Sequence, residues 1–498
     1  MKTMRVSLDV RRTAGSFPKY WSRCFGAERG GFFLRKDVLD HHRIGVRTFH
    51  NEFVRFHGIL HDDVGIAQRG HDGKVRYEWF NLEHAYDNIL DLGMRPFVEF
   101  SFMPAALALG DQTIFYWKGN VTLPKSFTEW GELIEAFVRR MRKRYGPVET
   151  RKWYWEVWNE PNLRKWFFAG SMEDYFRLYD HAACAVKRVD PRYRVGGPAT
   201  ACGEWIREMI EHCRRENLAR PSAGSTPLDF VSTHLYPGDP FFMEGEGMKL
   251  DWKGEAFFRE TIRRNHRIVR SYPSMGLEMH MTEWNCSSNS RDPIHDGPNA
   301  AAFAVKAIQE VAGLVDTFSW WTLTDIFEES GLPPAAFHGG FGLLTVDGLR
   351  KPSWYAFESL QDLGTRLLAK PLSTPDHAAG LIPTAGDDGS ARLLFWNFAM
   401  PGSPKPPARS VDLVLKGLPR DRKAVTVELK RIDDDHTNIR GEWERMGSPQ
   451  SLDAAAKARL SALDRFEPAE VRDLPVRGGT ARYRFRLPVP GVAYAVVR

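Results

Sequence analysis

Short apolar segments alternate with helical patterns over most of the chain, and this alternation limits the possible folds more than any other feature. Strands are predicted at residues 23–27, 47–56, 96–103, 153–160, 194–199, 229–236, 278–285 and 316–325. Helices are predicted at 82–92, 127–145, 172–189, 204–217, 254–271, 299–314 and 353–363. Such an alternation is typical of a (β/α)8 TIM barrel. An open doubly wound sheet is the alternative, but no GxGxxG motif follows the first strand.

The pattern changes after residue 364. Alternating strands are predicted at 391–398, 410–416, 424–432, 481–488 and 491–498. They indicate an additional C-terminal antiparallel β-sandwich domain. We therefore expect a catalytic barrel at residues 15–360 and a sandwich at 361–498. A helical insertion near 449–464 interrupts the sandwich, and residues 1–14 alternate in a way that is compatible with one added strand.

Carboxylates fall at the ends of two predicted barrel strands. Glu160 ends the fourth strand and Glu283 ends the seventh. Catalytic residues of TIM barrels lie at the C-terminal ends of strands, so these two side chains can face each other across the mouth. Two facing carboxylates are what glycoside hydrolysis requires. A single glutamate at a strand end is more often an ion-pair partner or a helix cap, but Trp and Asn beside both glutamates favour catalysis.

The run WYWEVWNEPN, residues 153–162, places Glu160 after four aromatic residues. Burying a charge is costly unless the charge is paired or used. We expect this aromatic, poorly solvated setting to keep Glu160 protonated at neutral pH, as a general acid requires. Glu156 lies on the same strand face and is expected deeper in the barrel, in a structural role. Glu99 is also expected to be structural, paired with an arginine such as Arg55.

Charge and cysteine content exclude several classes of protein. The net charge is +6, and the densest basic run, residues 139–146, ends a helical pattern, so we expect no nucleic-acid partner. No apolar stretch approaches about 18 residues, so no membrane association is expected. The five cysteines are widely spaced without a CxxC motif, which argues against a disulfide framework or a zinc site. Reduced thiols and a charged N-terminus lead us to expect a cytoplasmic protein without metal or cofactor.

The motifs around the two glutamates resemble a known family. WNEPN with Glu160 and MTEWN with Glu283 resemble retaining glycosidases that carry both catalytic glutamates on strands four and seven. The segments that narrow the resemblance to glycoside hydrolase family 39 are VRFHGILHDD (54–63), FSFMP (100–104), STHLYP (232–237), TDIFEESGLPPAAFHGGFGLL (324–344) and RKPSWYAF (350–357). The β-xylosidase branch fits best, although the family also includes α-L-iduronidases.

The resemblance implies a role for each matching residue. Glu160 is the implied general acid/base and Glu283 the implied nucleophile of a double displacement with retention. In that mechanism the two carboxyl groups lie about 5–5.5 Å apart. Asn159 is implied to bind the sugar 2-hydroxyl, and the Tyr236 hydroxyl to keep the nucleophile ionised. The full set of implied substrate-binding residues is His57, Asn159, His234, Tyr236, Trp321, Glu328, Glu329 and Phe337.

Some of these assignments stay open at the level of sequence. Either Glu328 or Glu329 is the main contact to the 3- and 4-hydroxyls, and a charged loop is the alternative. Trp321 and Phe337 are expected to stack on the sugar, with Phe115 or a neighbouring tyrosine closing the pocket. His234 is equally compatible with a buried core histidine.

The expected function is an exo-acting retaining β-xylosidase that removes terminal β-D-xylose from short xylooligosaccharides. An α-L-iduronidase is the alternative enzyme, but no Arg or Lys pair for a uronate is evident in the matching loops. A non-catalytic sugar-binding protein is a further alternative, and the presence of both glutamates argues against it. The sandwich is expected to be a structural companion, and the oligomeric state stays open.

Overall fold

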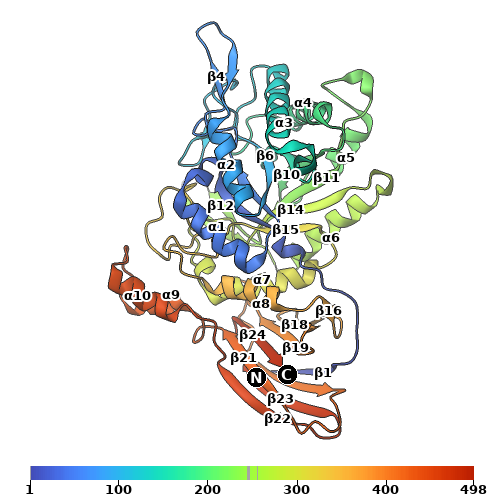
Figure 1. Ribbon diagram of the computed structural model, residues 1–498, viewed down its shortest axis with the longest axis vertical. Coiled ribbons are helices and arrows are strands. Elements are labelled where there is room, and N and C mark those ends of the chain that lie inside the picture. The colour runs from blue at the N-terminus through green and yellow to red at the C-terminus, as the bar shows by residue number, and fades with distance from the viewer. Residues whose placement is uncertain (1, 244–246, 255) are drawn as a thin grey trace.

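The computed structural model describes residues 2–243, 247–254 and 256–498. Eight parallel strands close into a barrel in the upper part of Figure 1, in the order in which they follow one another along the chain. They are β2 (Cys24–Arg29), β3 (Phe53–His57), β6 (Arg95–Phe100), β9 (Tyr154–Val157), β10 (Arg194–Ala201), β11 (Phe230–Leu235), β14 (Glu278–Trp284) and β15 (Thr317–Trp320). The predicted (β/α)8 barrel is confirmed, and Glu160, His234 and Glu283 belong to its fourth, sixth and seventh strands or their ends.

Helices cover the outside of the barrel. They are α1 (Lys36–Phe49), α2 (Phe80–Asp91), α3 (Phe127–Thr150), α4 (Met172–Val189), α5 (Ile206–Arg215), α6 (Phe257–Arg270), α7 (Pro298–Val311) and α8 (Pro352–Asp362). The predicted helices are all present, with ends that differ by a few residues. Helix α1 was not predicted, and the strand predicted at 47–56 began too early. Two histidines and a glycine, His41, His42 and Gly45, occupy buried positions of α1 and conceal its apolar period.

The interior of the barrel is layered. Alternate residues of a strand share one face, so Phe53, Arg55 and His57 of β3 all point inward. Aromatic residues close the N-terminal end of the barrel, where Phe53 packs with Tyr154 and its neighbours. Arg55 lies one layer higher, and His57 lies at the mouth. The site therefore lies above a charged layer, and an aromatic layer lies below that one at the N-terminal end of the barrel.

The C-terminal part forms two facing sheets in the lower part of Figure 1. One contains β1 (Lys2–Asp9), β20 (Arg409–Lys416) and β23 (Thr480–Leu487). The other contains β16 (Arg366–Leu367), β17 (Leu372–Ser373), β18 (Ala379–Ala385), β19 (Ala391–Asn397), β24 (Gly491–Val497), β21 (Ala424–Ile432) and β22 (Glu470–Pro475). Side chains of both sheets share one apolar core. Strand β1 pairs in parallel with β20, with Lys2 opposite Arg409, so the N-terminal segment does supply a strand to this domain. The division of the chain at residue 360 stays a prediction.

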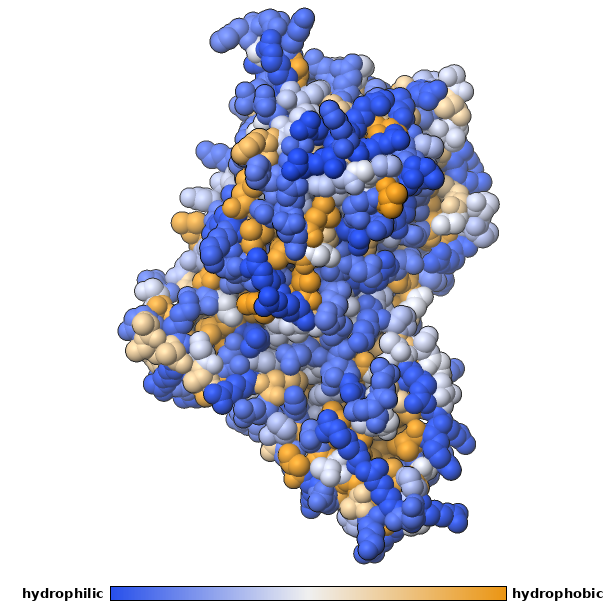
Figure 2. All heavy atoms as spheres, viewed as in Figure 1, coloured by the Kyte–Doolittle hydropathy of each residue, from blue (hydrophilic) through white to orange (hydrophobic). Residues whose placement is uncertain are grey.

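The larger sheet also packs against the barrel. The indole N–H of Trp396 donates to Oε1 of Gln309 in α7 at 2.8 Å, and the Tyr494 hydroxyl donates to Asp362 at the end of α8 at 2.6 Å. Every residue of β18 and β24 is buried, because these strands are covered on both faces. Strand β18 therefore lacks the alternating pattern and was not predicted. Figure 2 shows that hydrophobic residues on the visible face are scattered among hydrophilic ones over both domains.

Smaller elements complete the described chain. The short strands are β4 (Ala67–Arg69), β5 (Val75–Tyr77), β7 (Thr113–Ile114), β8 (Gly119–Asn120), β12 (Gly238–Met243) and β13 (Gly247–Trp252), and the 3-10 helices are Tyr20–Ser22, Gly30–Leu34, Pro221–Ala223, Pro273–Met275 and Pro293–Asp296. The predicted helical insertion appears as α10 (Ala454–Leu463), preceded by α9 (Ile439–Arg445), and both project from the sandwich in Figure 1. Among the described helices, none combines the length and the apolar composition needed to span a membrane.

Candidate active site

A cavity of about 320 Å³ lies at the C-terminal ends of the barrel strands. Its floor is polar and consists of side chains from strand ends and from the segment after β15: His57, Asn159, Glu160, Tyr236, Glu283 and Glu329. The size is that of a pocket for a small molecule. With Trp321, which also lines the cavity, seven of the predicted site residues are gathered around one space.

The backbone after β9 turns Glu160 into this cavity. Trp158 and Glu160 have φ angles of 71° and 46°, a left-handed conformation that non-glycine residues rarely adopt. The Glu160 N–H donates to the Ala199 carbonyl at the end of β10 at 2.8 Å, which holds the turn in place. Strained backbone of this kind is concentrated at functional sites, where the surrounding structure maintains it.

The aromatic residues before Glu160 do not form a wall around it, so that expectation was wrong. Residues alternate along a strand, and Trp153 and Trp155 therefore point outward, where they pack against Tyr86 and Phe137 of the surrounding helices. Tyr154 points into the barrel floor. His234 of strand β11 contacts the Glu160 carboxyl, with Nδ1 2.9 Å from Oε1.

Glu160 and Glu283 approach each other across the mouth. One carboxyl oxygen of each, together with a ring nitrogen of His234, lies within 4.8 Å of the others. His234 Nδ1 lies 2.9 Å from Glu160 Oε1 and 3.6 Å from Glu283 Oε2. The two glutamates that are far apart in the sequence thus share one small volume.

Glu283 is surrounded by donors. Arg55 Nη1 donates to Glu283 Oε1 at 2.6 Å, and the Tyr236 hydroxyl donates to Glu283 Oε2 at 2.8 Å. Burial and the nearby Glu283 and Glu160 carboxylates raise the pKa of Tyr236 well above its ordinary value, so its hydroxyl keeps its proton and remains a donor. A guanidinium and an O–H group therefore each hold one oxygen of this carboxylate.

Glu160 has a different environment. Its carboxyl contacts His234, whose pKa is held well below its ordinary value by burial and by the positive charge of Arg55. The imidazole is therefore neutral at neutral pH, and its Nε2 lies 3.1 Å from Thr282 Oγ1. Different surroundings for two nearby carboxyl groups are the arrangement that separates an acid from a nucleophile.

Arg55 lies at the centre of the layer beneath the cavity. The sequence predicted it only as a partner for Glu99. Its guanidinium lies 2.7 Å from Glu99 Oε2 and 2.6 Å from Glu156 Oε2, and donates to Asn159 Oδ1 at 2.9 Å. Burial raises the pKa of Glu156, with Arg55 opposing it. Burial acts in the same direction on Glu99, but Arg55 and His57 outweigh it and hold the pKa of Glu99 below its ordinary value. The structural roles expected for Glu99 and Glu156 agree with these contacts.

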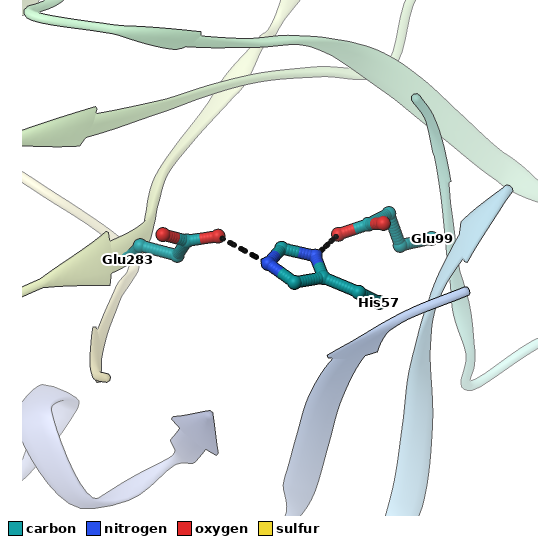
Figure 3. A group of neighbouring side chains, drawn as sticks. All are labelled: His57, Glu99 and Glu283. Atoms are coloured by element: carbon teal, nitrogen blue, oxygen red, sulfur yellow. Dashed lines mark hydrogen bonds and ion pairs between the residues drawn. The ribbon is translucent and has the colours of Figure 1, made fainter. Parts of the chain in front are cut away.

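His57 links this layer to the cavity. Figure 3 shows its ring between Glu99 and Glu283. Nδ1 lies 2.8 Å from Glu99 Oε2, and Nε2 lies 3.6 Å from Glu283 Oε1 and 3.5 Å from Glu329 Oε1. The Trp321 ring lies beside His57, with centroids 4.6 Å apart, and also lines the cavity.

The structure separates the two adjacent glutamates of the segment after β15. Glu329 lines the cavity, and burial together with the neighbouring carboxylates, Glu28 first among them, raises its pKa well above the ordinary value. Glu328 points away and forms ion pairs with Arg35 at 3.0 Å and Arg29 at 3.5 Å. Of the pair, Glu329 is therefore the one placed to contact a ligand.

Phe337 does not reach the cavity, which corrects its predicted role. Its ring packs against Trp443 of α9, with centroids 5.4 Å apart. Phe341 from the same segment lines the cavity instead. It stands in the string HGGFG, and Gly342 is required beside it, because a Cβ there would lie 2.4 Å from the backbone of Thr324 and Asp325. The string HGGFG was visible in the sequence, but it predicted only a tight turn and not that the Phe341 ring lines the cavity.

Two groups of side chains are close enough to be considered as metal ligands among the described residues: His57 with Glu99 and Glu283, and Glu160 with His234 and Glu283. Glu283 belongs to both, and it already accepts from the Arg55 guanidinium. A cation at either place would compete with a fixed buried positive charge. The donor set therefore fits hydrogen bonding better than metal coordination.

An eight-stranded barrel with two unlike carboxyl groups facing each other at strands four and seven defines a glycoside hydrolase. The chain belongs to glycosyl hydrolases family 39, whose family model matches residues 4–479. It is 39% identical over 452 residues to a β-xylosidase of Caldicellulosiruptor saccharolyticus, covering 91% of this chain and 89% of that protein. It is 37% identical to a β-xylosidase of Geobacillus stearothermophilus, covering 90% and 86%.

Solved structures agree with this assignment. A monomeric β-xylosidase from Caulobacter crescentus CB15 is similar with a TM-score of 0.86 and 32% identity, covering 100% of this chain and 99% of that chain. The human α-L-iduronidase is a more distant relative, 23% identical over 481 residues, covering 87% of this chain and 68% of that protein.

Proposed function

We propose that this glycoside hydrolase is an exo-acting retaining β-xylosidase that removes terminal β-D-xylose from xylooligosaccharides. The observation that carries the proposal is the close approach of Glu160 and Glu283 in unlike surroundings. Their oxygens lie within 4.8 Å of each other, which supports the short separation of a retaining enzyme, about 5–5.5 Å between carboxyl groups, over the wider spacing of an inverting enzyme.

In the first step, a carboxylate oxygen of Glu283 attacks the anomeric carbon. The bond from that carbon to the glycosidic oxygen breaks, and Glu160 gives its proton to the departing oxygen. Arg55 and Tyr236 hold the Glu283 carboxylate in a single orientation through its two oxygens. The product of this step is a glycosyl-enzyme ester and a shortened alcohol.

In the second step, Glu160 is a carboxylate and acts as a base. It takes a proton from water, the water oxygen bonds to the anomeric carbon, and the ester bond to Glu283 breaks. Two inversions give net retention. The donors from Arg55 and Tyr236 stabilise the negative charge that returns to Glu283 in this step.

The sugar would be held from several sides. Asn159 uses its side-chain oxygen to accept from Arg55, so its NH₂ group is the part of the amide that can bind a hydroxyl. Glu329 and His57 border the same space, and the family resemblance assigns them to the outer hydroxyls. A neutral sugar with several hydroxyls matches this mixture of donors and acceptors.

The cavity favours a neutral glycone over a uronate. The described residues that line it include Glu160, Glu283 and Glu329 but no lysine or arginine. Arg55 lies beneath the floor, and its guanidinium is already engaged by carboxylates. A substrate carboxylate would lack a free cationic partner, which argues against α-L-iduronidase. The higher identity to the two bacterial β-xylosidases supports the same choice.

Replacement of the nucleophile tests the mechanism. Glu283→Ala should abolish turnover of an aryl β-xyloside, and azide should restore it with formation of the α-xylosyl azide. Glu467→Ala, at an exposed glutamate of the sandwich, is the matched control. Full activity of Glu283→Ala without azide would refute the assignment.

Replacement of the acid is tested with a series of leaving groups. Glu160→Ala should slow substrates with poor leaving groups far more than activated aryl xylosides, because only the former need protonation. Equal losses across the series would contradict the acid role. Aryl glycosides of xylose, arabinose and iduronate, compared on the unchanged enzyme, test the glycone.

A further inference from the structure

We propose that Lys351 is a positioning residue for the reaction. Its buried ammonium group fixes the backbone of residues 339–342, which carries Phe341. Through the Phe341 ring, it keeps the Tyr236 hydroxyl directed at Glu283. The inference rests on the proposed function and adds to it a residue that does not line the cavity.

Lys351 is a fully buried lysine at the N-terminal end of α8. Its Nζ lies 2.7 Å from Asp296 Oδ1 and 2.5 Å from Asp325 Oδ2, and these three side chains, the charged cluster, are at most 2% exposed. Burial lowers the pKa of Lys351, but the two aspartates outweigh burial and raise the pKa above its ordinary value. The ammonium group therefore stays charged, and it donates to the Gly340 carbonyl at 2.9 Å.

Stability alone does not account for a lysine at this place. Lys351 is the N-cap residue of α8, and a positive charge at a helix N-terminus opposes the helix dipole. Well-packed hydrophobic residues can often replace a buried ion pair without loss of stability. An apolar side chain could not supply the hydrogen bond from Nζ to the backbone of Gly340. This contact is therefore the part of the arrangement that requires a cationic donor.

The two aspartates hold the same loop through their other oxygens. The Gly339 N–H donates to Asp296 Oδ2 at 2.7 Å, and the Gly342 N–H donates to Asp325 Oδ1 at 2.7 Å. The charged cluster therefore binds the backbone on both sides of Phe341. Since hydrogen bonds with an ionised partner are the stronger kind, they restrict the position of this residue.

The glycines let the loop approach the charged cluster closely. A Cβ at Gly340 would lie 2.3 Å from Asp325 Oδ1, and one at Gly339, whose φ is 77°, would lie 2.6 Å from the backbone of Arg291 and Asp292. The loop is thus enclosed between the charged cluster and the segment after β14. It has no room to shift while the cluster is intact.

His295 joins the loop to the lining of the cavity. Its Nδ1 lies 2.8 Å from the Gly339 carbonyl oxygen, and its Nε2 lies 3.1 Å from the Ser287 carbonyl oxygen. Its ring also packs near Phe341, with centroids 5.1 Å apart. Ser287 precedes residues 288–290, which line the cavity. The loop and this part of the wall are therefore held together.

Phe341 connects the position of the loop to a partner of the nucleophile. Its ring lies beside that of Tyr236, with centroids 6.4 Å apart, and both line the cavity. The Tyr236 hydroxyl in turn donates to Glu283 Oε2 at 2.8 Å. The Phe341 carbonyl also accepts from Asn285 Nδ2 at 3.2 Å, two residues after Glu283. If the loop moves, the Phe341 ring no longer limits the position of Tyr236, and the hydrogen bond to Glu283 weakens with the change in distance and angle.

Replacement of the lysine tests the role. Lys351→Met keeps much of the side-chain length and removes the ammonium group. With an activated aryl β-xyloside, kcat should fall about 5- to 50-fold, within the limit of about 10- to 150-fold for complete loss of a hydrogen bond to a charged group. The glycosyl-enzyme should accumulate, so a burst of leaving group should precede the slow phase, and KM should fall together with kcat.

A double-mutant cycle with Tyr236→Phe separates positioning from a general structural effect. If Lys351 acts through the Tyr236 hydroxyl, Lys351→Met should change kcat by no more than about twofold when that hydroxyl is already absent. Losses that multiply would mean that the two residues act independently, and would overturn the proposal.

Lys306→Met is the matched control. Lys306 is 3% exposed and pairs with Glu310 in α7 at 2.8 Å, so this variant also removes a buried lysine and leaves a carboxylate with one partner fewer. Its kcat should stay within about twofold of that of the unchanged enzyme. A loss as large as that of Lys351→Met would assign the effect to lowered stability, and would overturn the proposal.

Asp296→Asn decides the question if Lys351→Met does not fold. The asparagine keeps an acceptor for the Gly339 N–H, and Lys351 keeps its pair with Asp325, so the fold should persist. Its kcat should fall about 2- to 5-fold, and this loss too should disappear in the Tyr236→Phe background. An unchanged kcat in the folded variant would overturn the positioning role. An unchanged enzyme that did not hydrolyse the aryl β-xyloside would refute the proposed function and, with it, this inference.

Discussion

Tyr236→Phe removes one oxygen atom from the site and leaves the rest of the side chain in place. The phenylalanine ring would keep the contacts of Tyr236 with the buried cluster of Trp321, Phe327 and Phe341. What disappears is the O–H donor that lies 2.8 Å from Glu283 Oε2. Arg55 continues to donate to the other oxygen at 2.6 Å, so the carboxylate keeps one of its two partners.

The size of the effect follows from the charge of the acceptor. A hydrogen bond to a charged group contributes about 1.5–3 kcal/mol. At about 1.36 kcal/mol for each factor of ten in rate, its loss corresponds to a decrease of about 10- to 150-fold. In the proposed double displacement, the second step should bear most of this decrease, because the donor would stabilise the charge that develops as Glu283 leaves the glycosyl-enzyme.

Pre-steady-state kinetics with an activated aryl β-xyloside measure this directly. Steady-state kcat of Tyr236→Phe should fall by the stated factor, and a burst of one leaving group per active site should precede it. Tyr77→Phe, in the β4–β5 hairpin outside the cavity, is the control for removal of a tyrosine hydroxyl. A kcat within twofold of the unchanged enzyme, or a large loss without any burst, would refute the reasoning.

Three further predictions concern the stability of the fold and its independence of metal. Arg55→Met should lower the free energy of unfolding by about 3–5 kcal/mol in urea denaturation, because it leaves buried carboxylates unpaired; a loss below about 1 kcal/mol would contradict this. Burial raises the pKa of Glu28 from its ordinary 4.5 to about 8, despite Arg29. The protonated Glu28 therefore makes its full contribution to the stability of the folded protein below pH 4.5, and this contribution is lost as the pH rises to 8. The Tm of Glu28→Gln relative to the unchanged enzyme should therefore increase between pH 5 and pH 8. An equal Tm difference at both pH values would argue against a buried, protonated Glu28. EDTA should leave kcat/KM unchanged, and a loss that a divalent cation restores would show a metal requirement.

Much of the barrel could be predicted because its signals are local. Buried parallel strands are short apolar runs, and the covering helices show a period of three to four residues. Helix α1 was missed where histidines occupy buried positions, and β18 where both strand faces are covered. In both cases the partner surface, which the local sequence does not contain, decided which residues were buried.

The site was predictable only in part for the same reason. Glu160 and Glu283 could be paired because strand number places them on opposite sides of a barrel mouth. No comparable rule predicts the direction of a side chain in a loop. Glu329 rather than Glu328 lines the cavity because Arg35 and Arg29 engage Glu328, and these partners come from a distant part of the chain.

The sequence by itself determined the succession of barrel strands and helices and the two glutamates at strand ends, since short apolar runs and helical periods are local signals. Only the tertiary structure decided what surrounds those groups. Trp155 turns outward, although it belongs to the run that leads to Glu160. Phe341 enters the cavity in place of Phe337. These features depend on packing between segments that are remote in the chain, and the local periodicity of the sequence does not predict such packing.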